Sequence, residues 1–147
     1  MQLNNKTAII TGAGRGLGRA IALAIAREGA QVSIMSRTEA ELAEVAASIR
    51  HTGGTCRFFS GDVSQESDAS GIVEATLDDF GGVDILVNNA GVIGPVRFLE
   101  DADGTAWRHT LAINLNGAYY CARAVAPHMM RQGAGKVINI ASGLGEM

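Results

Sequence analysis

The sequence contains few cysteine, proline and aromatic residues. Among 147 residues there are two cysteines and two prolines, and aromatic side chains make up 5%. Cys56 and Cys121 cannot build the disulfide framework of a small secreted protein, so we expect a reduced, cytoplasmic protein. The longest apolar run, residues 20–26, is too short to cross a bilayer, and the opening MQLNNK holds no apolar signal region. The sequence therefore predicts neither secretion nor a membrane partner.

The sequence also has no tract of one charge. It carries 12 basic and 15 acidic side chains, for a net charge of -3, and the two signs are mixed along the chain. A nucleic-acid partner is therefore not expected, and we assign no metal ligands. With 47% hydrophobic and 18% charged residues, the composition is that of one globular domain. Glycine is in excess: 19 of the 147 residues are glycine, whereas an average protein, at about 7%, would have roughly ten.

Short apolar runs alternate with longer helical patterns. They predict strands over residues 7–11, 31–35, 55–60, 83–87 and 136–141, and helices over 15–28, 38–52, 64–80 and 103–131. Thr38 and Glu41 have the spacing of a capping box, and Ser64 can cap the third helix. Apolar strands separated by helices predict an α/β protein with a parallel sheet covered on both faces.

Right-handed crossovers between the strands would give a doubly wound sheet, the class to which dinucleotide folds belong. A complete dinucleotide fold of this type has six strands, whereas the sequence supplies five. We therefore expect residues 1–147 to form a single dinucleotide-binding domain that is incomplete at its C-terminus.

A glycine-rich turn joins the first strand to the first helix. Glycines stand at positions 12, 14, 16 and 18. Such a turn lets backbone amides approach a ligand, and the helix N-terminus favours an anion. No lysine follows the glycines as in a nucleoside triphosphatase. The alternative is a glycine-rich turn that binds nothing.

Five motifs follow in order along the chain: TGAGRGLG at 11–18, DV at 62–63, NNAG at 88–91, INL at 113–115 and NIAS at 139–142. In this order, and at these structural positions, they resemble the short-chain dehydrogenases/reductases over all 147 residues. The resemblance implies a Rossmann-type, doubly wound parallel sheet with strand order 3-2-1-4-5, and a nicotinamide dinucleotide cofactor. It assigns cofactor binding to Gly12, Gly16, Leu17, Gly18, Asp62, Val63, Asn89, Ala90 and Gly91.

Each of these motifs also has a purely structural interpretation. Asp62 can serve as an acid near a helix N-terminus, and the two asparagines of NNAG can form an ordinary turn. By resemblance, Asp62 accepts a hydrogen bond from the adenine amino group and Val63 lies against the ring. Asn89 and Gly91 then support the adenosine ribose and the sheet.

The end of the second strand bears on which cofactor binds. An acid about 20 residues past the glycines normally holds the ribose 2′-hydroxyl of NAD, whereas an arginine accommodates the 2′-phosphate of NADP. Here Ser36 stands in place of the acid and Arg37 follows it. Arg15 can add a second positive charge, so NADP(H) is favoured and NAD(H) is possible. The alternative for Arg37 is a solvated surface residue.

The resemblance assigns catalytic roles to Asn114 and Ser142. The matching asparagine of the family bends the long helix and holds a water of the proton relay, and the serine binds the substrate oxygen. The alternatives are an exposed helix asparagine and a turn serine. The family also uses a Tyr-x-x-x-Lys pair, but neither Tyr119 nor Tyr120 has lysine four residues later.

These observations favour an NADP(H)-dependent oxidoreductase that acts on a carbonyl or alcohol, resembling short-chain reductases such as the 3-oxoacyl reductases. We expect the full-length form to be a homo-oligomer and the 147-residue chain alone to be inactive. One alternative is a nucleotide-binding module without catalysis. The other is a methyltransferase, whose glycine-rich turn also holds an adenosyl cofactor.

Overall fold

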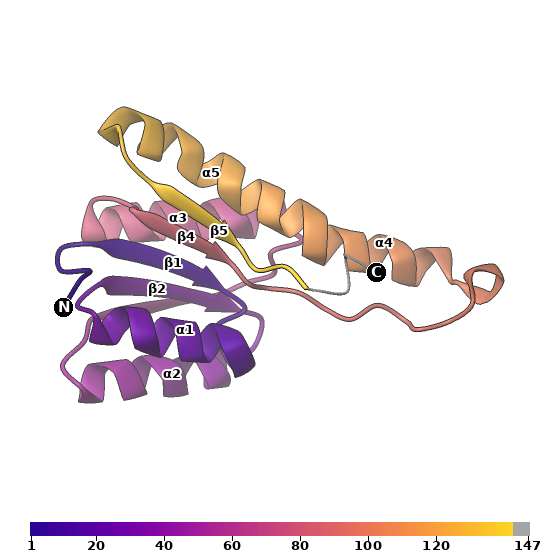
Figure 1. The fold of residues 1–147 in the computed structure, drawn as a ribbon, viewed down its shortest axis with the longest axis horizontal. Helices are drawn as coiled ribbons and strands as arrows, with labels where there is room; N and C mark the ends of the chain where they lie inside the picture. The colour runs from indigo at the N-terminus through magenta and orange to yellow at the C-terminus, as the bar shows by residue number, and fades with distance from the viewer. Residues whose placement is uncertain (143–147) are drawn as a thin grey trace.

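The apolar runs form one parallel sheet in the order β3-β2-β1-β4-β5, as the sequence predicts (Figure 1). The computed structural model describes residues 1–142. Its strands are β1 Thr7–Thr11, β2 Gln31–Ser36, β3 Cys56–Ser60, β4 Ile85–Asn88 and β5 Lys136–Asn139. The strand order reverses between β2 and β4, which both pair with β1. In open sheets of this kind, ligands bind at the strand carboxyl ends beside such a reversal.

Helices cover both faces of the sheet (Figure 1). The chain contains α1 Gly16–Arg27, α2 Glu39–His51, α3 Glu66–Phe80, the short η1 Leu99–Asp101, α4 Gly104–Leu111, the π turn η2 Ala112–Asn116 and α5 Gly117–Gln132. α1 and α2 pack on one face, and α3 and α5 on the other. The segment between β4 and α4 runs out to the far end of α4 (Figure 1).

The core consists of two layers separated by the sheet. Along β1, Ala8 and Ile10 point toward α1 and α2, whereas Ile9 points toward α3 and α5, because successive side chains of a strand face opposite sides. Each layer contains one cysteine: Cys56 lies in the first and Cys121 in the second, 3% and 0% exposed. Burial raises the pKa of both thiols from 9.0 to about 11, an effect that the charge of Arg50 partly opposes at Cys56.

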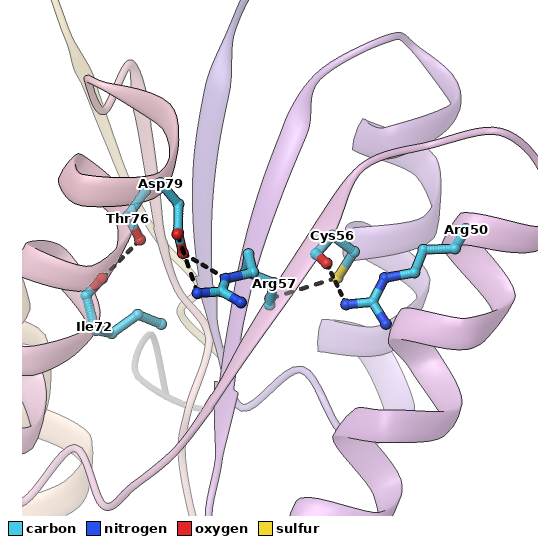
Figure 2. Close-up of polar contacts among 6 residues, drawn as sticks. All are labelled: Arg50, Cys56, Arg57, Ile72, Thr76 and Asp79. Carbon is cyan, nitrogen blue, oxygen red and sulfur yellow. Dashed lines mark hydrogen bonds and ion pairs between the residues drawn. The ribbon is translucent and has the colours of Figure 1, made fainter.

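The edge strand β3 is attached to a helix on each face of the sheet (Figure 2). From α2, Arg50 donates a 2.7 Å hydrogen bond to the carbonyl of Cys56. Arg57 of β3 forms a two-bond ion pair with Asp79 of α3, at 2.5 and 3.0 Å. These contacts fix the start of β3 against both helical layers.

The helix starts and one long helix differ from the sequence-based expectations. Thr38 precedes α2, but its side chain makes no capping hydrogen bond, so the capping box with Glu41 is wrong. α3 begins after Gln65 rather than Ser64. The helix expected over 103–131 is three consecutive pieces, because the π turn η2 interrupts it. Within residues 1–142, no helix is both long and apolar enough to span a membrane.

Candidate functional site

A cavity of about 280 Å³ lies at the carboxyl ends of the strands. Its walls come from the turn after β1, the end of β2, the turn after β3 and the segment after β4. Of the twelve predicted cofactor-binding residues, all but Gly16 line it: Gly12, Arg15, Leu17, Gly18, Ser36, Arg37, Asp62, Val63, Asn89, Ala90 and Gly91. Segments spread over some 80 residues of sequence thus meet at one place.

The glycine turn after β1 has no room for a side chain at Gly12 or Gly18. Gly12 has a φ of +65°, and a Cβ on it would lie 2.8 Å from the Cα of Ala90. A Cβ on Gly18 would collide with the carbonyl oxygen of Gly12 and the side-chain amide nitrogen of Asn89. Gly16 has a φ of +56° with open space around it, so its requirement is backbone conformation alone. The glycines therefore bring the turn close to the segment after β4.

The N-terminus of α1 faces this cavity without a capping side chain. Arg15 precedes the helix and makes no capping hydrogen bond, and the first turn of α1 contains no acidic residue. The first backbone amides of a helix have no partner within the helix, and the helix dipole makes this end positive. The arrangement suits an anionic group such as a pyrophosphate.

Thr11 joins the glycine turn to the segment after β4. Its Oγ1 accepts hydrogen bonds from the backbone amides of Asn89 and Ala90, both at 3.1 Å, and donates to the carbonyl of Val87 at 3.4 Å. The side-chain amide of Asn89 donates to the carbonyls of Thr11 and Gly12, at 3.0 and 3.2 Å. Asn89 therefore holds the two walls together.

Two arginines and one acid surround the end of the cavity formed by β2. Arg37 is exposed and forms no ion pair within the described chain. Arg15 lies 3.9 Å from the carboxylate of Glu41, which comes from the first turn of α2 and also lines the cavity. The Oγ of Ser36 interacts with the backbone of Thr38 at 3.4 and 3.5 Å.

Asp62 closes the cavity on the β3 side. One of its carboxylate oxygens, Oδ1, accepts a hydrogen bond from the amide of Ser64 at 2.9 Å. Its own backbone amide donates to Asp68 of α3 at 2.9 Å. These two bonds fix the turn after β3, and within residues 1–142 the other carboxylate oxygen, Oδ2, forms no hydrogen bond.

Asn114 lies in the π turn η2 and binds the backbone of Val92. Its side-chain amide donates to the Val92 carbonyl, and its side-chain oxygen accepts from the Val92 amide, both at 2.8 Å. The segment after β4 is thereby tied to the interruption of the long helix. A π turn widens the helix by one residue and is frequent at functional sites.

Ser142 is exposed and follows β5 by a short segment. A second, smaller cavity of about 60 Å³ lies nearby, between β4, β5 and the π turn, and Asn114 and Ile140 both line it. Asn88, 7% exposed, donates to Asn139 at 2.9 Å and to the carbonyl of Ala118 at 3.3 Å. These bonds place the chain leading to Ser142 beside the π turn that carries Asn114.

Three residues that hold the site together were not predicted as site residues. Thr11 and Asn88 belong to the motifs TGAGRGLG and NNAG, so their neighbours gave the available signal. Glu41 belongs to none of the five motifs, and its spacing from Thr38 suggests only a helix cap. Its position in the cavity depends on how α2 packs.

Comparison with known proteins gives the family. A model described as short chain dehydrogenase matches residues 6–147. The chain belongs to the short-chain dehydrogenase/reductase family. An uncharacterized oxidoreductase of Thermotoga maritima is 36% identical to this family member over 145 residues, which is 99% of this chain and 57% of the relative.

Solved structures agree with this assignment. NAD⁺-bound xylitol dehydrogenase superposes with a TM-score of 0.95 at 34% identity, over 99% of this family member and 56% of the neighbour. A metagenomic short-chain oxidoreductase in complex with NADP gives a TM-score of 0.92 at 34% identity, over 97% and 64%. The chain thus spans 56–64% of the length of these three relatives.

Proposed function

We propose that residues 1–147 form the cofactor-binding part of an NADP(H)-dependent oxidoreductase that acts on a carbonyl or alcohol. The observation that carries the proposal is the cavity of about 280 Å³, which eleven of the twelve predicted cofactor residues line. Its glycine turn has no room for side chains at Gly12 and Gly18, which fits a ligand held by backbone amides.

The residues present fit an adenine dinucleotide. The uncapped N-terminus of α1 would hold the pyrophosphate, and Asp62 and Val63 would hold the adenine. Arg37 and Arg15 would bind a 2′-phosphate through charge-assisted hydrogen bonds. When bound, the nicotinamide cofactor supplies the hydride, and the protein orients it and moves the proton. Two solved relatives carry NAD⁺ and NADP respectively, which supports a nicotinamide cofactor of either kind.

Asn114 and Ser142 are proposed to act on the substrate side. Asn114 holds the segment after β4 through Val92, and Ser142 would hydrogen-bond the substrate oxygen. The second candidate function is dinucleotide binding without turnover. It is favoured by one observation, namely that no tyrosine of the 147 residues has lysine four positions later.

Titration calorimetry with NADPH and NADH tests the proposal. We expect NADPH to bind more tightly, and Arg37→Ala to weaken NADPH alone by about 1.5–3 kcal/mol, the range for hydrogen bonds to charged groups. Arg27→Ala, an exposed arginine in the last turn of α1, is the matched control. Equal losses for both nucleotides would contradict the phosphate assignment, and no binding of either would overturn the cofactor site.

A further inference from the structure

One carboxylate lies where the sequence lacks an acid. A Cβ placed on Gly14 would lie 2.8 Å from Oε2 of Glu41 and 2.9 Å from Oγ of Ser36. Both oxygens therefore lie on the same side of Gly14, although Glu41 comes from α2 and Ser36 ends β2. The serine that stands in place of the ribose-binding acid thus has a carboxylate next to it.

The packing of α2 fixes the position of this carboxylate. Leu42, the next residue, is 0% exposed in the core layer beneath α2, which sets the rotation of the helix. Glu41 is left at the rim of the cavity with its side chain 35% exposed, 3.9 Å from Arg15. Its neighbour Glu39 carries the same charge at the helix start, but it is exposed and does not line the cavity.

We propose that Glu41 determines the balance between NADH and NADPH at this site; the inference rests on the proposed function. A carboxylate beside Ser36 can accept the hydrogen bond of a free ribose 2′-hydroxyl, as the acid at the end of β2 does in NAD-binding sheets. The same carboxylate repels a 2′-phosphate and competes with it for Arg15. Glu41 therefore favours NADH, whereas Arg37 and Arg15 favour NADPH.

Opposite effects on two ligands distinguish this role from a structural one. If Glu41 only tethers the glycine turn through Arg15, its loss changes the affinity of both nucleotides by the same factor. If it contacts the ribose, Glu41→Gln weakens NADH and tightens NADPH. Glutamine keeps the size of the side chain and removes only the charge.

The experiment measures the dissociation constants of NADH and NADPH by calorimetry for the parent protein, Glu41→Gln and Glu41→Ala. We expect Glu41→Gln to raise the constant for NADH about tenfold and to lower that for NADPH about three- to tenfold. Glu39→Gln is the matched control and should change neither by more than about twofold. In an Arg15→Ala background, the gain for NADPH from Glu41→Gln should shrink, because the competition for Arg15 is gone.

Each result decides the matter. Shifts in opposite directions support the proposal, and shifts by one common factor, or none, overturn it while leaving the cofactor site intact. If Glu41→Gln lowers the melting temperature, Glu41→Ala and the ratio of the two constants provide a second comparison, because misfolding reduces both affinities together. A parent protein that binds neither nucleotide would refute the proposed function itself, and this inference with it.

Discussion

Gly18→Ala changes one hydrogen atom to a methyl group at the tightest point of the glycine turn. The new Cβ would collide with the carbonyl oxygen of Gly12, a backbone atom, and with the side-chain amide of Asn89. Asn89 cannot move away freely, because that amide donates to the carbonyls of Thr11 and Gly12. The substitution therefore forces the turn to open, the amide to swing away, or both.

Three contributions determine how much Gly18→Ala lowers the free energy of unfolding. Overpacking of a closed site costs about 1–3 kcal/mol. Each lost hydrogen bond of the Asn89 amide costs about 0.5–1.5 kcal/mol. Gly18 lies in the first turn of α1, where alanine is the better helix former by about 1 kcal/mol, which offsets part of the loss. We expect Gly18→Ala to lower the free energy of unfolding by about 2–3 kcal/mol.

Gly16→Ala is the matched control in the same turn. Gly16 has a φ of +56° but nothing within 4 Å of a built Cβ, so alanine there meets only the strain of a left-handed backbone, about 1–2 kcal/mol. Urea denaturation followed by circular dichroism measures both variants. Equal losses, or a larger loss at Gly16, would refute the reasoning, because collision rather than backbone strain is what distinguishes Gly18.

Three further predictions concern stability and activity. Thr11→Val should lower the free energy of unfolding by about 2–4 kcal/mol in urea denaturation, because two backbone amides lose their common acceptor, whereas Thr11→Ser should lose little. The buried thiols should make unfolding easier at alkaline pH: with pKa values raised from 9.0 to about 11, their stabilising contribution is complete below pH 9 and is lost as the pH rises toward 11. The slope is about 1.4 kcal/mol per pH unit for each thiol, and urea denaturation of a Cys56→Ala/Cys121→Ala variant over the same pH series should lack it. The 147-residue chain alone should show no oxidation of NADPH at 340 nm with a panel of ketones; turnover that disappears on Ser142→Ala would reveal a proton donor elsewhere in the chain.

The central strands β1 and β2 could be predicted from the sequence because burial on both faces favours short runs of apolar and β-branched residues. The run at residues 7–11 coincides with β1, and all five residues are buried. Helix starts were predicted less well. Thr38 and Glu41 satisfy the pattern of a capping box, yet the packing of Leu42 turns Glu41 toward the cavity. The capping-box pattern describes only the spacing of two residues, whereas the rotation of the helix determines which groups each side chain contacts.

The candidate site shows the same division. Gly12 and Gly18 could be predicted from the sequence because any side chain at these positions would collide with neighbouring atoms, so only glycine fits. Asn114 was also predicted as a site residue, but its contact with Val92 was not predicted. Asn114 makes two hydrogen bonds to the backbone of Val92, 22 residues away. Nearly every residue has the same backbone amide and carbonyl, so these bonds do not require a particular side chain at position 92.

The placement of one cysteine in each core layer has a practical consequence. A thiol with a pKa near 11 is almost entirely protonated at neutral pH, and a buried thiol reacts with a disulfide reagent only after its surroundings open. Cys56 becomes accessible when the α1 and α2 layer separates from the sheet, and Cys121 when the α3 and α5 layer does. The two labelling rates therefore report the opening of each side of the sheet separately, without an added probe. Equal rates would mean that the sheet and both helical layers open as one cooperative unit, and unequal rates would identify the layer that detaches first.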